Sequence, residues 1–116
     1  MKAYTDIEQS KKLADILPLE SADGFYEAQI NPFTNKWEDI LFVGNEWASD
    51  EVVIPAWSLS ALLAIIPYPT LGKHADETWS CASWVEKVNP YFVEGCDTPI
   101  DACYEMIIKL HELKIL

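Results

Sequence analysis

The sequence predicts an α+β fold in which a small antiparallel sheet of about four strands packs against two or three helices. Aromatic-rich segments joined by short turn signals indicate the antiparallel strands. Apolar residues at helical spacing, next to residues typical of helix caps, indicate the helices. Half of the residues are hydrophobic, which suffices for one core in a chain of 116 residues. We therefore expect residues 1–116 to form a single globular domain.

The first helix is expected over residues 5–17. Asp6 followed by Gln9 has the spacing of a capping box, in which each side chain accepts a hydrogen bond from the other's backbone. Pro18 closes the helix because a proline cannot continue the hydrogen-bond ladder. Residues 21–24 then form a turn.

Two strands are expected over residues 25–30 and 37–43. The segment between them, residues 31–36, carries turn residues, so the pair is predicted to form a hairpin. A further short extended piece is expected over residues 46–54.

Residues 52–72 form a run of 21 residues without a charged side chain. A helix of about 20 apolar residues spans a bilayer, but Pro55, Pro67 and Pro69 interrupt this run. The remaining segment, residues 57–66, is therefore expected to form a short core helix that begins near Ser58. We expect no interaction with a membrane. The apolar residues of this helix lie on most sides, so a sheet, another helix or a partner chain is expected to cover it on more than one side.

The last third of the chain predicts a loop over residues 68–78, a strand over 79–88 and a returning strand over 91–93. A final helix is expected to begin at Thr98 as N-cap, with Pro99 in its first position. Glu105 and Lys109 are spaced for an ion pair along this helix. Its apolar stripe comprises Ile100, Cys103, Met106, Ile107, Leu110 and Lys114.

Three segments occur here in a recognisable order: EQSKKLADILPLESAD, then AWSLSALL running to Pro67 with Trp79 after it, then PIDACYEM. This order resembles a group of small proteins from phages and prophages of Bacteroidetes bacteria. The resemblance implies a mobile-element origin, and it carries over no activity and no functional residue. Cys103 stands where that group has Leu, and Ala61 with Ala64 replaces more polar residues, which indicates greater burial of the central helix.

The charge balance restricts the class of partner. The chain has 19 acidic residues and 8 basic ones, and all of the basic residues are lysines, so its net charge is −11. Because phosphate contacts depend on cationic side chains, and on arginine above all, direct nucleic-acid binding is disfavoured. The acidity indicates a self-repelling, soluble surface. The alternative is that the carboxylates mimic nucleic acid and inhibit a host DNA-binding enzyme.

The three cysteines, Cys81, Cys96 and Cys103, match no zinc-binding spacing. They indicate reduced thiols and a cytoplasmic location, and the N-terminal segment has no secretory signal pattern. Cys103 lies on the apolar stripe and is expected to be buried. Cys96 stands beside Asp97, whose charge disfavours a thiolate, and the environment of Cys81 does not follow from the sequence.

No catalytic, cofactor-binding or metal site is assigned. His74 and His111 belong to no metal-binding motif. The acidic residues near the last helix are expected to be capping residues and those of the loop to be solvated charges: Asp97, Asp101 and Glu105, and Asp76 and Glu77. A small metal-dependent hydrolase remains the third and weakest alternative.

The five tryptophans are the residues most informative about function, because tryptophan is enriched both in cores and at interface hot spots. We assign most of them to the core, and one or two exposed ones would mark a partner surface. They are Trp37, Trp47, Trp57, Trp79 and Trp84. The sequence thus favours a non-enzymatic protein-interaction module without a cofactor, whose partner is an unidentified protein or a second copy.

Overall fold

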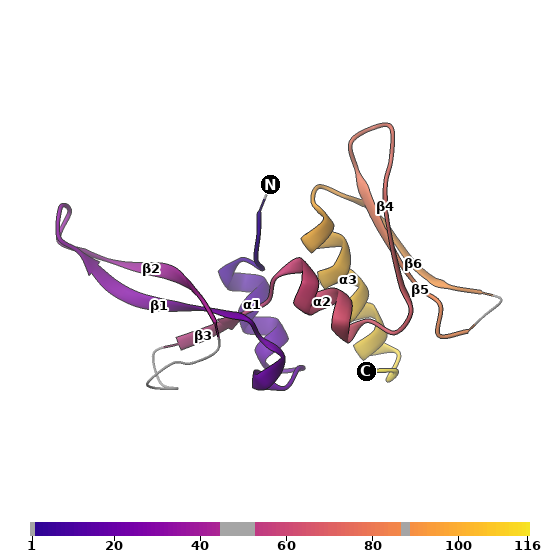
Figure 1. The fold of residues 1–116 in the computed structure, drawn as a ribbon, viewed down its shortest axis with the longest axis horizontal. Coiled ribbons are helices and arrows are strands. Elements are labelled where there is room, and N and C mark those ends of the chain that lie inside the picture. Colours follow the sequence, from indigo (N-terminus) through magenta and orange to yellow (C-terminus); the bar gives the residue numbers. More distant parts are fainter. Residues whose placement is uncertain (1, 45–52, 87–88) are drawn as a thin grey trace.

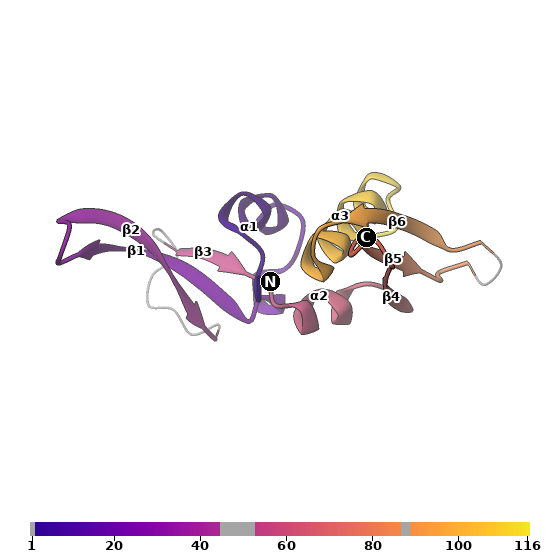
Figure 2. The same ribbon diagram turned by 90° about the horizontal axis from the view of Figure 1, so that it is seen from above.

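The computed structural model describes residues 2–44, 53–86 and 89–116. In this part of the chain three α-helices lie between two antiparallel sheets of three strands each. Figures 1 and 2 place the two sheets at opposite ends of the molecule, with the helices between them. The molecule is elongated, with principal extents of 53 × 31 × 20 Å.

The first sheet has the strand order β2-β1-β3. Strands β1 (Gly24–Asn31) and β2 (Lys36–Val43) pair along their whole length, which confirms the first predicted hairpin. Strand β3 (Val53–Ala56) pairs only with the first half of β1. The outer half of the hairpin therefore projects as a two-stranded arm (Figure 1). Residues 46–52 of the predicted extended piece, including Trp47, lie outside the described residues.

The second sheet has the strand order β4-β5-β6. Strands β5 (Trp79–Ser83) and β6 (Tyr91–Cys96) form the second predicted hairpin, although β5 ends earlier than predicted and residues 87–88 lie outside the described part. The predicted loop over residues 68–78 is wrong over residues 69–73, because β4 (Pro69–Lys73) pairs with β5 there, whereas residues 74–78 form the turn between the two strands. Pro69 is tolerated because it occupies the first position of an edge strand.

The α+β class is confirmed, but the single sheet of about four strands is wrong. Each hairpin takes its own third strand, β3 for the first and β4 for the second. Helix α2 (Leu59–Ile65) lies between these two strands in the chain and separates the sheets (Figure 1).

The caps of the three helices are those that the sequence predicts. Helix α1 (Ile7–Ala14) is shorter than expected, but it begins with the predicted capping box between Asp6 and Gln9. Ser58 Oγ accepts a hydrogen bond from the Ala61 N–H at 3.2 Å at the start of α2. Thr98 Oγ1 accepts one from the Asp101 N–H at 3.1 Å, and α3 (Pro99–Glu112) has Pro99 in its first turn.

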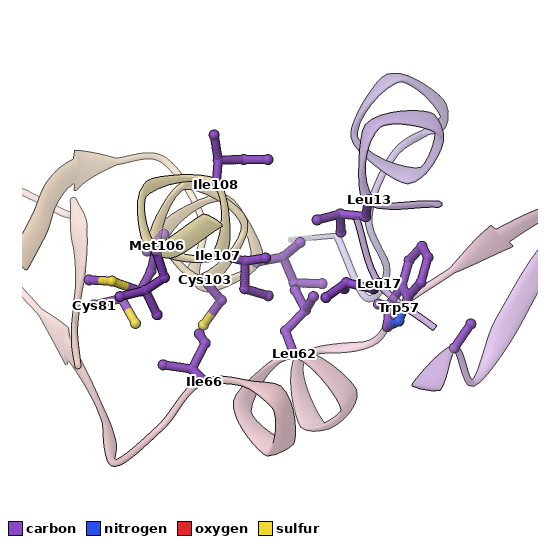
Figure 3. Packing of buried hydrophobic residues seen from close by; sticks show 14 residues of the cluster. Leu13, Leu17, Trp57, Leu62, Ile66, Cys81, Cys103, Met106, Ile107 and Ile108 are labelled. Atoms are coloured by element: carbon purple, nitrogen blue, oxygen red, sulfur yellow. The ribbon is translucent and has the colours of Figure 1, made fainter. Parts of the chain in front are cut away.

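The core lies between α3 and the surrounding elements (Figure 3). Leu62 and Ile66 contact α3 from α2 and its C-terminal end. Leu13 and Trp57 lie at the end of the core that is far from Cys81. Ala61 is half-buried and packs against the core, whereas Ala64 is exposed, so the expected greater burial of α2 is wrong at Ala64. The helix is short, and its main helical neighbour is α3 on one side. The predicted stripe of α3 is buried at Ile100, Cys103, Met106, Ile107 and Leu110, whereas Lys114 lies beyond the helix end.

The predicted ion pair between Glu105 and Lys109 is also wrong. Lys109 Nζ instead donates a hydrogen bond to the Phe92 carbonyl oxygen at 3.0 Å. Helix α3 packs against β6, which brings this carbonyl within reach of the lysine. Among the described residues, no helix combines the length and the apolar character needed to cross a membrane.

Candidate functional site

The described tryptophans divide into buried and exposed ones. Trp57 is fully buried, and its ring N–H donates a hydrogen bond to Ser21 Oγ at 2.9 Å. Trp79 is half-buried and packs against the core. Trp37 is 70% exposed and Trp84 is 42% exposed. Two tryptophans are therefore in the position that the sequence analysis associates with a partner surface.

Trp37 lies on one face of the projecting arm. Alternate residues of a strand point to opposite faces, and residues paired across an antiparallel ladder share a face. The register pairs Ile30 with Trp37 and Ala28 with Asp39. We define the open face by the residues that this register places on the Trp37 side of the outer hairpin: Ala28, Ile30, Trp37, Asp39 and Leu41.

The molecule covers the base of this same side of the sheet. Tyr26, which pairs with Leu41, donates a hydrogen bond from its hydroxyl to the Thr5 carbonyl oxygen at 2.7 Å. A Cβ atom at Gly24 would lie 2.6 Å from the Tyr4 ring, so only glycine permits this close approach. Along β1 the apolar side therefore continues from a covered base to the open face, which no described element covers, whereas Val43, which pairs with Gly24 on β2, is 80% exposed. On the open face, Ile30 is 50% exposed.

The opposite side of the arm is polar toward the turn, and Ile40, which is 38% exposed, lies on it further from the turn. Asn31 Nδ2 donates hydrogen bonds to Glu38 Oε1 at 3.1 Å and to Oε2 at 3.2 Å. Gln29 Nε2 donates one to Glu27 Oε2 at 3.2 Å. Lys36, the cation of this hairpin, also lies on this side, because it pairs with Asn31. The outer hairpin is thus amphipathic, although no described element packs on its apolar side.

Asp39 lies in the middle of the open face. It stands between Trp37 and Leu41 along β2 and opposite Ala28 on β1. No ion pair and no side-chain hydrogen bond engages its carboxylate within residues 2–44, 53–86 and 89–116. The open face therefore presents one unpaired negative charge among apolar side chains.

A second group of exposed aromatic residues lies on the other sheet. Tyr68 is 75% exposed and has a φ of 44°, a left-handed conformation that is uncommon for an aromatic residue. The ring N–H of Trp84 donates a hydrogen bond to Thr70 Oγ1 at 2.6 Å. Phe92, on the neighbouring strand, is 45% exposed. The ring N–H of Trp84 is thus satisfied within the molecule, whereas that of Trp37 has no partner among the described residues.

The structure gives the acidic residues near α3 separate environments. Asp101 Oδ1 lies 2.6 Å from Lys2 Nζ and accepts a hydrogen bond from Gln9 Nε2 at 2.8 Å. Partial burial raises the pKa of Asp101, but hydrogen bonds from Lys2, Gln9 and Thr98 outweigh it and hold the pKa below its usual value. Asp97 and Glu105 are exposed. Asp101 thus lies in the first turn of α3, behind the N-cap Thr98, and links the helix to the N-terminal segment.

The remaining charged candidates lie at the surface. Asp76 Oδ1 accepts hydrogen bonds from the backbone and hydroxyl of Thr78, which lower the pKa of the Asp76 carboxyl. Glu77 forms an ion pair with Lys73 at 2.9 Å. His74 and His111 are both exposed. In the described part of the chain, no three histidine, cysteine or acidic side chains converge in a group suited to a metal ion.

The three cysteines lie close to one another, and the hydrogen bond between Cys81 and Cys103 lowers the pKa of Cys81. Cys81 and Cys103 are fully buried free thiols that point into the core (Figure 3). The hydrogen bond with Cys81, together with burial, raises the pKa of Cys103 far above its usual range. Cys96 is half-buried, and burial followed by the charges of Glu105, Asp101 and Asp97 raises its pKa. The predicted burial of Cys103 and the predicted effect of Asp97 on Cys96 are both confirmed.

Comparison with known proteins adds no name to this site. No protein-family model, curated protein or solved structure matches the chain. The candidate functional site therefore rests on its geometry. Of its residues, only Trp37 is a functional candidate by sequence, whereas Asp39, Ile30 and Leu41 lie within predicted strands and carry no functional signal there. Apolar and polar residues alternate next to the turn over residues 28–31 and 36–38, but Asp39 and Ile40 interrupt this alternation.

Proposed function

We propose that this chain is a non-enzymatic protein-interaction module of mobile-element origin, which acts in the cytoplasm by docking its open face on another protein. The observation that supports the proposal is the 70% exposure of Trp37 on an apolar strand face that no described element covers. Large apolar residues gathered on one exposed face mark interaction sites more often than singly scattered ones do. Tryptophan is also the residue most enriched among interface hot spots.

The conformation of the arm is consistent with this role. Its two strands pair along their whole length, and its base is fixed to the N-terminal segment by the bond from Tyr26 to Thr5. Binding to a preorganised surface loses less conformational entropy than binding to one that must first become ordered. The arm thus presents its side chains without a prior folding step.

Affinity capture from the native host tests the proposal. The wild-type protein, Trp37→Ala and Trp84→Ala are immobilised in parallel, and bound proteins are identified by mass spectrometry. Both substitutions remove an exposed tryptophan, so Trp84→Ala is a matched control at the other end of the molecule. We expect one partner to be retained by wild type and by Trp84→Ala and lost with Trp37→Ala.

The outcomes separate the possibilities. Loss with Trp84→Ala alone would keep the interaction module but move its surface to the second sheet. A strictly monomeric protein that captures no partner and shows a clear enzymatic turnover would overturn the proposal.

The alternative is an acidic nucleic-acid mimic that inhibits a host DNA-binding enzyme. The net charge of −11 and the absence of arginine favour it. A captured partner that is a DNA-binding enzyme, and that duplex DNA releases from the immobilised protein, would support this alternative.

A further inference from the structure

The open face is bordered by a strand edge that no described strand occupies. Strand β2 is at the end of the order β2-β1-β3, so it pairs with β1 on one side only. An edge strand presents a row of backbone donors and acceptors that an extended segment of another protein can join. Side chains of such an added strand alternate between the two sides of the sheet. Every second residue of the added strand would therefore lie beside the open face.

The chemistry of the open face specifies those residues. Trp37 and Leu41 present apolar surface on either side of the Asp39 carboxylate, which has no ion-pair partner in the described part of the chain. An added strand that places an apolar residue beside Trp37, a lysine or arginine beside Asp39 and an apolar residue beside Leu41 would complement all three. Opposite charges across a strand pair are favourable, whereas like charges directly opposite are unfavourable.

We propose that the open face and the edge of β2 bind an extended segment of another protein in which apolar residues flank a lysine or arginine at every second position. This inference rests on the proposed function and names the partner's chemistry. The bound segment forms a fourth strand of the first sheet and extends its apolar side. The net charge of −11 favours the same basic partner, because complementary charge accelerates encounter.

A second copy of this chain fits the open face less well. Pairing two β2 strands about Asp39 would set the two Asp39 carboxylates against each other. Shifting the pairing so that Ile40 faces Ile40 would set Asp39 beside Leu41. The hairpin cation, Lys36, lies on the polar side and meets Asp39 in neither arrangement. A copy of β2 would therefore leave the carboxylate uncompensated.

A library of random twelve-residue peptides displayed on yeast, selected against the immobilised full-length protein, tests the proposal. We expect the selected peptides to carry a lysine or arginine flanked two positions away by apolar residues. Asp39→Lys should weaken the best peptide by about 2- to 30-fold, because an attraction becomes a repulsion. Exchanging the peptide's basic residue for glutamate should restore its binding to Asp39→Lys.

Glu38→Lys is the matched control, since it makes the same charge change at the adjacent residue on the polar side of β2. We expect it to leave the dissociation constant within about twofold of wild type, as expected of an exposed charge that the bound strand does not face. Thermal unfolding of each variant establishes that it is folded.

The contradicting outcomes are distinct. Selected peptides without a basic residue, an equal effect of Glu38→Lys, or no enrichment at all would overturn the proposed occupant. A dimer in sedimentation that Trp37→Ala dissociates would assign the face to a second copy. A native partner that Trp84→Ala loses and Asp39→Lys retains would refute this surface while leaving the proposed function intact.

Discussion

Lys2 Nζ lies 2.6 Å from Asp101 Oδ1, so the first described residue of the chain is paired with the first turn of α3. Gln9 of α1 donates a second hydrogen bond to the same carboxylate. One side chain thus joins the N-terminal segment, α1 and α3. The contact holds together segments that are close to opposite ends of the sequence.

We expect Asp101→Asn to destabilise the protein by about 1–2 kcal/mol at pH 7, because hydrogen bonds to a partly buried charged group are lost. The folded-state pKa of Asp101 is lowered, so its contribution is present above the unfolded pKa of about 4 and disappears as pH falls through the folded value. The difference in unfolding free energy between wild type and variant should therefore shrink below about pH 4. Urea titrations at several pH values measure it.

Glu105→Gln is the control for this prediction, because it removes an exposed carboxylate one turn further along α3. We expect a change within about 0.5 kcal/mol at every pH. An equal loss of stability in both variants would show that Asp101 acts only through net charge.

Leu62→Ala should destabilise the fold by about 2–5 kcal/mol, since Leu62 is fully buried between α2 and α3 and its truncation leaves a cavity. Leu63 is half-buried beside it, so Leu63→Ala should destabilise the fold by at least about 1 kcal/mol less than Leu62→Ala does. Chemical denaturation of both variants measures the difference. Equal midpoints would mean that α2 does not pack against α3 through Leu62.

Local chemistry made the helices predictable. The capping box of Asp6 and Gln9, the N-cap Ser58 and the Thr98-Pro99 pair act within one turn of chain, and all three occur where they were predicted. Both hairpins were predictable for the same reason, because turn residues specify the pairing of neighbouring strands.

The division into two sheets was not predictable, because it depends on which distant segment joins each hairpin. Strand periodicity identifies a strand but not its partner. Pro67 and Pro69 also made β4 resemble a loop, although an edge strand tolerates a proline in its first position. The exposure of Trp37 could not follow from alternation, since it depends on β3 (Val53–Ala56) pairing with β1 only from Gly24 to Glu27 and on no described element lying over the outer arm.

Cysteine labelling tests the core assignment. In the folded protein only Cys96 should react with a thiol reagent at pH 8, and more slowly than a free thiol because its pKa is raised. Cys81 and Cys103 should stay protected until the protein unfolds. Mass spectrometry before and after addition of guanidinium counts the labelled residues, and Cys96→Ser should abolish native-state labelling. Rapid native labelling of Cys103 would contradict the packing of α3.

The salt dependence of partner binding separates docking on the open face from mimicry of nucleic acid. Apolar burial is little screened by salt, and an exposed ion pair at Asp39 is worth at most about 1 kcal/mol. Binding should therefore weaken by less than about tenfold between low and physiological ionic strength, where the Debye length is about 8 Å. A mimic would depend on many carboxylates acting together, so its binding would weaken steeply with salt and duplex DNA would compete for the partner.

We expect a shallow salt dependence and no competition by DNA. Binding measured across a salt series, with and without duplex DNA, decides between the two, and a steep loss together with displacement by DNA would favour the mimic.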